Sequence, residues 1–92
     1  MATLLSWEVY MIETESGLLY TGITNQLEKR FVAHQMQKKG AKFFRFSSPQ
    51  KIVFRETHPD RSSASKRESS LKKMTRAKKL LLVAEFQKKS SL

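Results

Sequence analysis

Apolar residues recur at every second position in three short runs of the chain, which is the spacing typical of β-strands. The first two runs cover residues 7–13 and 18–24, and Ser16-Gly17 between them is a turn signal. The third run covers residues 51–57 and stops at His58-Pro59, because proline cannot continue a paired strand. The pattern therefore predicts a β-hairpin followed by a third strand.

Between the second and third runs the apolar spacing changes to that of a helix, from Asn25 to about Gly40. Asn25 and Glu28 have the spacing of a capping box, which favours a helix start at this point. At 100° per residue, Arg30 and His34 lie beside the apolar stripe of this helix rather than on its solvent side. We therefore expect both side chains to border the core.

Helical spacing returns after the third strand. A second helix is expected from Arg61, with Asp60 or Ser62 as its cap, and a last helix is expected after a kink that Thr75 can cap. These two helices complete the set of elements that the apolar pattern predicts.

Together the elements predict a single α/β (α+β) domain over residues 1–92. Its architecture is a three-stranded antiparallel sheet flanked by helices. The core is expected at about residues 7–85, and residues 87–92 are expected to form a frayed tail.

The charge of the chain is concentrated in its last third. The 92 residues carry 18 Lys and Arg against 8 Asp and Glu, a formal net charge of +10. Residues 61–92 hold ten of these cations and two of the anions, a net charge of +8 for this segment. Such an imbalance is typical of a surface that binds a polyanion, although a solvated helical face or contact with an acidic membrane would use the same residues. We expect nucleic acid to be the partner.

Several function classes are excluded or disfavoured by what the sequence lacks. It has no cysteine, so it forms neither disulfides nor thiolate metal sites. It has no run of about 20 apolar residues that would span a membrane. No basic N-terminal region followed by a long apolar one is present, so no signal peptide is expected and the expected location is the cytoplasm.

Reactive side chains gather on the predicted strand–strand–helix unit, which carries Tyr10, Tyr20, Arg30 and His34. Gly22 interrupts the second strand without a side chain, and close approach of a ligand or of other protein atoms is the usual reason. Structural roles are also open: the tyrosines could be cross-strand aromatics, the arginine a surface cation and the histidine part of the core rim.

Glu68 is the remaining reactive candidate. It falls on the inward face of the second helix with Ala64 and Leu71. A carboxylate in such a place is normally paired, hydrogen-bonded or metal-bound, because burying an unpaired charge is costly. A structural partner would be Arg67 or Arg30.

The order of these residues carries a family resemblance. Val9-Tyr10 and Tyr20-Thr21-Gly22 stand where one nuclease superfamily has the ends of its two motifs, GIY and YIG. Arg30 is followed four residues later by His34, as on the helix of that superfamily, and Glu68 stands in the place of its metal-binding glutamate. The chain thus resembles the GIY-YIG nuclease superfamily, and most closely its small stand-alone bacterial members. Glu8 in place of the first glycine, and Phe43 where a tyrosine is common, depart from the pattern.

The resemblance implies a metal-dependent DNA endonuclease that acts in DNA repair or processing. Glu68 would hold one Mg²⁺ or Mn²⁺ ion, and Arg30 would grip the scissile phosphate with its planar fork. Tyr10 would be the general base or would orient the water, and His34 could share the base or relay role. Tyr20 would position water or phosphate.

Seven basic residues are candidate contacts to the phosphate backbone of DNA, which would make binding insensitive to base sequence. They are Lys72, Lys73, Arg76, Lys78 and Lys79 after the glutamate, and Lys42 and Arg45 in the phenylalanine-rich loop. We expect DNA, including branched or single-stranded DNA, as substrate, and a monomer or weak dimer. The alternatives are a non-catalytic nucleic-acid-binding module on the same fold and a protein-interaction domain whose basic helices meet an acidic partner.

Overall fold

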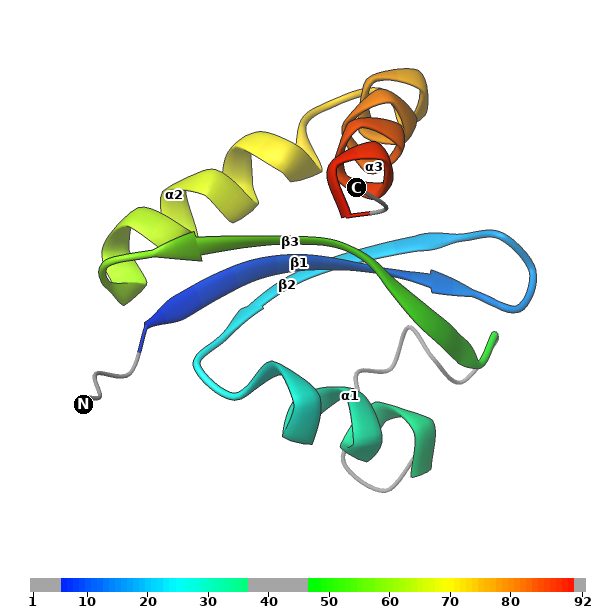
Figure 1. Cartoon of the computed structure of the whole chain (residues 1–92), viewed down its shortest axis with the longest axis horizontal. Coiled ribbons are helices and arrows are strands. Elements are labelled where there is room, and N and C mark those ends of the chain that lie inside the picture. Colours follow the sequence, from blue (N-terminus) through cyan, green and yellow to red (C-terminus); the bar gives the residue numbers. More distant parts are fainter. Residues whose placement is uncertain (1–5, 37–46, 91–92) are drawn as a thin grey trace.

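The computed structural model describes residues 6–36 and 47–90 of the chain (Figure 1). Within them one antiparallel sheet has the strand order β2-β1-β3. The strands are β1 (Trp7–Thr14), β2 (Leu19–Thr24) and β3 (Pro49–His58), and the helices are α1 (Leu27–Met36), α2 (Arg61–Lys72) and α3 (Arg76–Ser90). The prediction of a three-stranded antiparallel sheet flanked by helices is confirmed. The phenylalanine-rich loop, with Lys42 and Arg45, lies outside the described residues.

The sheet separates two helical layers, with α1 on one face and α2 and α3 on the other (Figure 1). Alternation along the central strand β1 supplies both faces, because successive side chains of a strand point to opposite sides. Val9 and Met11 pack toward α2 and α3, whereas Tyr10 and Ile12 pack toward α1. All four side chains are at most 1% exposed. Tyr10 is therefore on the side of the sheet that α1 covers.

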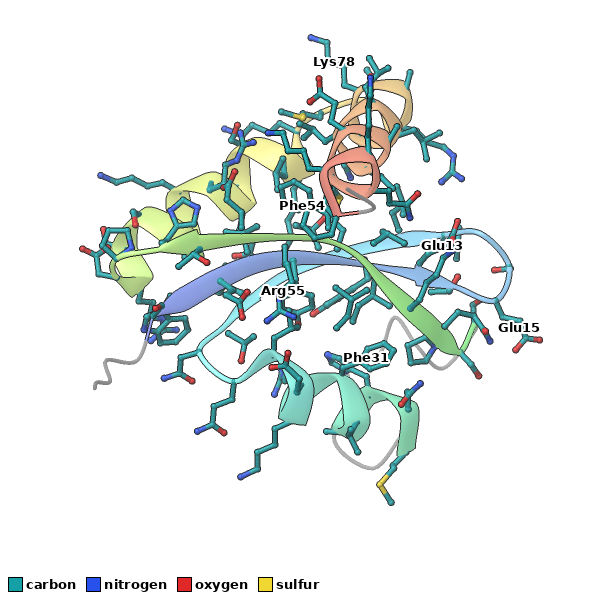
Figure 2. The ribbon with its side chains drawn as sticks, in the orientation of Figure 1. Glu13, Glu15, Phe31, Phe54, Arg55 and Lys78 are labelled. Atoms are coloured by element: carbon teal, nitrogen blue, oxygen red, sulfur yellow. The ribbon has the colours of Figure 1, made fainter. Side chains whose placement is uncertain are left out.

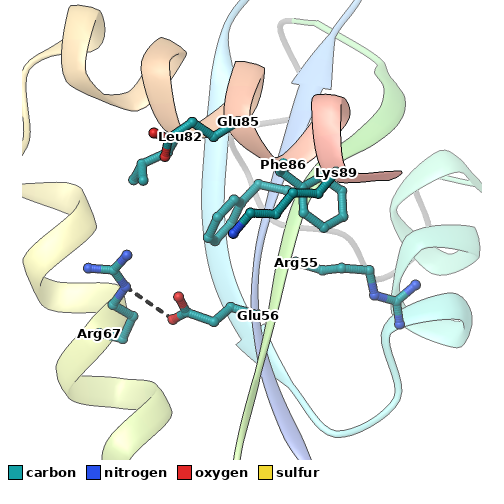
Figure 3. Close-up of a pocket in the computed structure, with 8 residues that line it drawn as sticks. Arg55, Glu56, Arg67, Leu82, Glu85, Phe86 and Lys89 are labelled. Carbon is teal, nitrogen blue, oxygen red and sulfur yellow. Dashed lines mark hydrogen bonds and ion pairs between the residues drawn. The ribbon is translucent and has the colours of Figure 1, made fainter. Parts of the chain in front are cut away.

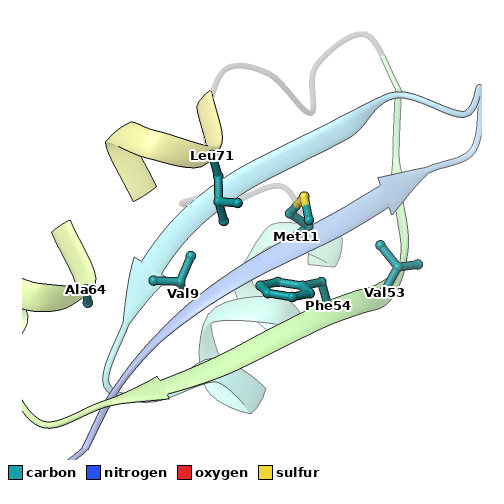
Figure 4. Close-up of a cluster of buried hydrophobic side chains, with 6 residues drawn as sticks. All are labelled: Val9, Met11, Val53, Phe54, Ala64 and Leu71. Atoms are coloured by element: carbon teal, nitrogen blue, oxygen red, sulfur yellow. The ribbon is translucent and has the colours of Figure 1, made fainter. Parts of the chain in front are cut away.

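The larger core cluster fills the layer under α2 and α3 (Figure 4). Val53 and Phe54 both belong to it although they are neighbours in the strand. The pairing of β1 with β3 shifts register between Met11 and Ile12, and such an irregularity places an extra residue on one side of a ladder. The shift therefore explains how two consecutive residues serve the same core.

Short polar contacts fix where the helices begin. The Asp60 carboxylate caps α2 by accepting a hydrogen bond from the backbone N–H of Ser63 at 2.8 Å. Thr75 caps α3 in the same way, since its hydroxyl accepts from the N–H of Lys78 at 3.2 Å. Both caps are the ones that the sequence predicts.

Helix α1 begins at Leu27, close to the expected start near Asn25, and the Glu28 carboxylate of the expected capping box instead binds Arg55 at 2.9 Å. One expectation about a helix end is wrong. Helix α3 runs to Ser90 instead of fraying from residue 87. Its last turn carries two lysines, which suit the negative end of the helix dipole, and its Phe86 ring packs 5.7 Å from that of Phe54.

An ionic network ties α1 to the sheet. Arg55 on β3 binds the carboxylate of Glu8 on β1 with two hydrogen bonds of 2.8 Å each, and it also binds Glu28 on α1 at 2.9 Å. Both glutamate contacts raise the pKa of Arg55, with Glu8 the largest cause. Glu8 is the residue that replaces the family's glycine, so in this chain that position anchors a strand pair and a helix. Figure 2 shows Arg55 between the sheet and α1.

We expect Arg55→Met to lower the free energy of unfolding by about 1–2 kcal/mol, because the Glu8 carboxylate would lose its bidentate partner while partly buried. Chemical denaturation at neutral pH measures this change. The matched control is Lys51→Met on the same strand, which breaks an exposed 3.9 Å contact with Glu13 and should cost less than about 0.5 kcal/mol. Equal losses in the two variants would contradict a structural role for the network.

Candidate active site

The phenol of Tyr10 lies across Gly22. The two residues are direct partners in the ladder between β1 and β2. A Cβ atom built on Gly22 would lie 2.6 Å from the Tyr10 hydroxyl oxygen and 2.8 Å from the ring carbon that bears it. Since β2 is an edge strand, the ring extends from the middle of the sheet over its border. The absence of a side chain at residue 22 thus makes room for the phenol.

Three rings meet at this border and are called the ring cluster here: Tyr10, Tyr20 and His34. The hydroxyl of Tyr10 lies 3.5 Å from Nε2 of His34, which is fully buried on α1. The His34 ring packs edge-on against Tyr20 with centroids 5.6 Å apart, and the two tyrosine rings are 6.2 Å apart. Residues from β1, β2 and α1 therefore share one contact region.

Burial sets the protonation of the ring cluster. Burial raises the pKa of Tyr10 to about 12, with help from the neighbouring Tyr20 phenol, although a hydrogen bond and the positive charge of Arg30 oppose the rise. Burial also lowers the pKa of His34 to about 4, and the charge of Arg30 acts in the same direction. At neutral pH the cluster therefore consists of a protonated phenol beside a neutral imidazole.

Arg30 is exposed on α1 and acts on both members of this pair, through its hydrogen bond to Tyr10 and its charge near His34. Of the two residues expected to border the core, His34 is fully buried whereas Arg30 is exposed to solvent. A cation that is both exposed and next to a buried phenol is available to an incoming anion.

Glu68 lies on α2, in the helical layer across the sheet from α1 (Figure 1). Its charge contributes to the raised pKa of Tyr10, after the larger effects of burial, Tyr20 and Arg30. Helix α2 packs against β2, over whose border the phenol extends. The carboxylate is mostly buried and binds Lys72 at 3.1 Å, one turn further along α2. The expected structural partners do not hold it, because Arg67 instead binds Glu56 at 3.1 Å.

The predicted phosphate-binding residues of the described chain surround the turn between α2 and α3. Lys72 is paired with Glu68, and Arg76 donates to the backbone carbonyl of Gly17 at 2.8 Å. Lys73 and Lys78 are exposed, and Lys79 is partly buried. Lys78 extends away from the sheet in Figure 2. These cations lie on the side of the sheet opposite α1.

The residues near Glu68 suit a single hard cation and do not form a cage. Within residues 6–36 and 47–90, no group of three or more His, Asp or Glu side chains comes together around a metal position. Magnesium, however, binds through one or two carboxylates and fills its other positions with water and substrate oxygens. The chemistry of the donors therefore fits one ion on Glu68, provided that Lys72 releases the carboxylate.

A separate cleft of about 310 Å³ lies at the β3 side of the molecule, and no predicted site residue lines it (Figure 3). Its floor is formed by Phe54, Leu82 and Phe86, and its charged lining includes the Glu56–Arg67 pair. Sequence reasoning had not identified it, because its walls come from three elements whose packing is not visible in the apolar pattern. It is distinct from the ring cluster.

The sequence motifs agree with the family to which the relatives of the chain belong. The family described as the GIY-YIG catalytic domain matches residues 6–80. A UPF0213 protein of Desulfotalea psychrophila is 41% identical over 83 residues, which cover 90% of this chain and 76% of the relative. A UPF0213 protein of Xanthomonas axonopodis pv. citri is 41% identical over 80 residues, covering 87% and 78%. The chain therefore belongs to the GIY-YIG family.

Within that family the similarity is to UPF0213 proteins, and it extends to three dimensions. The solution NMR structure of a UPF0213 protein from Bacillus halodurans has a TM-score of 0.55 to this chain at 33% identity, covering 86% of this chain and 83% of the other. The expected resemblance to small stand-alone bacterial members of the family is confirmed. The helices of the described chain are too short or too polar to cross a lipid bilayer.

We expect Gly22→Ala to lower the free energy of unfolding by about 1–3 kcal/mol, because the new methyl group would overlap the Tyr10 ring. In a Tyr10→Leu background, which lacks the overlapping atoms, the same change should be neutral or stabilising, since alanine restricts the unfolded chain more than glycine does. Chemical denaturation of wild type, Gly22→Ala, Tyr10→Leu and the double variant measures this coupling. An equal cost in both backgrounds would show that the phenol is not the reason for the glycine.

His34 should make the protein less stable in acid. Its folded pKa of about 4 lies below the unfolded value of about 6.5, so the unfolded state takes up the proton first. The stabilisation is complete above pH 6.5 and is lost as the pH falls toward 4, to the extent of about 3 kcal/mol. The measurement is the pH titration of the His34 imidazole by NMR, together with denaturation of wild type and His34→Gln from pH 7 to 4.5. A titration midpoint of the His34 imidazole near 6.5 would show that its pKa is not lowered and would refute the prediction.

Proposed function

We propose that this protein is a divalent-metal-dependent endonuclease that hydrolyses phosphodiester bonds of DNA with little sequence preference, in DNA repair or processing. The supporting observation is the convergence at the β2 border: the ring cluster, the guanidinium of Arg30 and the charge of Glu68 all act on one phenol. Membership of the GIY-YIG family supports the same reaction class.

Arg30 is proposed to bind the scissile phosphate. Its guanidinium offers a planar pair of donors that match two phosphate oxygens, which an ammonium group cannot do. Because it is exposed and also hydrogen-bonded to Tyr10, it would bring the phosphate next to the phenol. Tyr20, the outer tyrosine of the ring cluster, would help to place the phosphate or the attacking water.

Tyr10 and His34 are proposed to activate the water as a relay. A phenol with a pKa of about 12 is protonated at neutral pH, so it does not act as a base by itself. Neutral His34 can take the phenolic proton at Nε2 while the phenol oxygen takes a proton from water, provided that the negative charge of a bound phosphate raises the pKa of the imidazole from about 4. The relay makes the imidazole the final acceptor and leaves hydroxide to attack phosphorus.

Glu68 is the residue that would hold one Mg²⁺ or Mn²⁺ ion. Such an ion, when bound, supplies positive charge that stabilises the developing charge on the phosphate. Lys72 neutralises the carboxylate in the structure described here and would exchange it for the ion, after which its ammonium group is available to a DNA phosphate. Lys73, Lys78 and Lys79 extend the same basic surface and would contact the backbone without reading bases.

The test is nicking of supercoiled plasmid and cleavage of branched and single-stranded DNA, in Mg²⁺ or Mn²⁺. Glu68→Ala and Arg30→Ala should each reduce the rate at least about 100-fold, because they remove the metal carboxylate and the phosphate clamp. Matched controls are Glu85→Ala and Lys29→Ala, exposed residues of the same charge on α3 and α1, which should stay within about threefold of wild type.

Cleavage that survives both site variants would refute the assignment. A second candidate function, a non-catalytic nucleic-acid-binding module, is favoured by the protonated Tyr10 and by the Glu68–Lys72 ion pair. It would be identified by salt-sensitive DNA binding without cleavage in either metal. In that case Glu68→Ala should leave binding unchanged or tighter, since it removes a negative charge.

A further inference from the structure

Helix α3 is apolar on two opposite sides. Leu82, Val83 and Phe86 face the sheet and pack against the larger core cluster. At 100° per residue the opposite side of the helix carries Leu81 between two alanines, with Leu80 beside them. The outer stripe is defined as Ala77, Leu80, Leu81 and Ala84, and all four residues are exposed. A helix with apolar residues on two opposite sides normally buries both of them.

The outer stripe has no role in the proposed hydrolysis. Leu80 is 41% exposed and Leu81 is 66% exposed, which makes Leu81 the most exposed large apolar side chain of the described residues. Contacts to a phosphate backbone are made by cations and hydrogen-bond donors and do not bury leucine. Exposed apolar residues gathered on one face instead indicate a protein or membrane contact.

The charges beside the stripe define the kind of partner. Helix α3 has five basic residues against one acidic residue, a net charge of +4: Arg76, Lys78, Lys79, Lys88 and Lys89 against Glu85. A second copy would place the same excess of positive charge on both sides of the contact, which disfavours self-association through this helix. An acidic surface would complement it.

The shape of the outer stripe favours an acidic helix over an acidic membrane as the partner. The stripe runs from residue 77 to residue 84, about 10 Å or two helical turns, and one side chain wide. It contains no aromatic residue of the kind that anchors interfacial helices, and the opposite face of α3 is occupied by the core. Its small alanines on both sides of Leu81 allow a second helix to approach closely, as in helix pairs generally.

We propose that the outer stripe of α3 is a docking surface for an acidic amphipathic helix of a partner protein. Leucines of that helix would pack between Leu80 and Leu81, and its flanking carboxylates would meet Lys88 and Lys89. The surface lies on the far side of the sheet from α1, the helix toward which Tyr10 packs, so such a partner could be bound while the ring cluster remains accessible (Figure 1).

The probe is a labelled synthetic peptide of about 18 residues, long enough to form a helix, with leucines along one stripe and glutamates beside it. Its fluorescence anisotropy is measured against the intact protein at about 50 mM and about 300 mM salt. We expect binding that weakens with salt and NMR shift changes centred on α3. Leu81→Gln should reduce affinity at least about tenfold. The matched control Leu18→Gln, at a leucine 44% exposed on the β1–β2 turn, should leave affinity unchanged.

A peptide of the same composition with its leucines scrambled should bind at least about tenfold more weakly. Equal binding of the scrambled peptide, or equal affinity of Leu81→Gln and wild type, would overturn the proposal in favour of simple charge attraction. Dimerisation of the free protein that Leu81→Gln abolishes would overturn it in favour of a second copy. Tighter binding to vesicles of anionic lipid than to the peptide would overturn it in favour of a membrane. DNA cleavage is not expected to change in Leu81→Gln, so this test is independent of the proposed function.

Discussion

The contact between the Tyr10 ring and the backbone of Gly22 is the constraint on which the candidate site depends. It carries a side chain from the central strand over the border of the sheet, where the charges of Arg30 on α1 and Glu68 on α2 both act on it. The same contact keeps the phenol in surroundings of low polarity, which is why its proton is held so firmly. Position and reactivity of Tyr10 therefore have one physical origin.

The network around Arg55 is the second constraint, because it determines where α1 lies. Glu8 and Glu28 belong to different elements, and Arg55 binds both, so the start of α1 is held against the two strands next to it. Arg30 and His34 follow on the same helix. A position at which the family has glycine has thus acquired a carboxylate with a structural partner. This departure from the motif changes the contacts that hold α1 against the sheet and leaves the reactive side chains of the site in place.

The three strands and the pairing of the first two as a hairpin could be predicted from the sequence, because both depend on local alternation. The same alternation predicted that Tyr10 points to the opposite face of the sheet from Val9. The sequence did not allow the ion pair between Glu28 and Arg55, 27 residues away, to be predicted. The Glu8–Arg55 pair spans 47 residues and depends on the pairing of β1 with β3, which no local pattern reveals. The partner of Glu68 was also missed, as Lys72 competes with the arginines that were expected.

The order of the reactive residues could be recognised from the motif, whereas their protonation states required knowledge of burial. Their catalytic roles stay predictions.

Tyr10 belongs to a hydrophobic core and to the ring cluster at once. A mutation that shortened the side chain would harm folding and chemistry together, whereas one that removed the hydroxyl oxygen would leave the core filled. During evolution, selection for stability alone would preserve an aromatic ring at this position in a descendant that had lost its activity. An aromatic ring at this position therefore says little about whether a descendant is active. Retention of the hydroxyl oxygen is the informative feature.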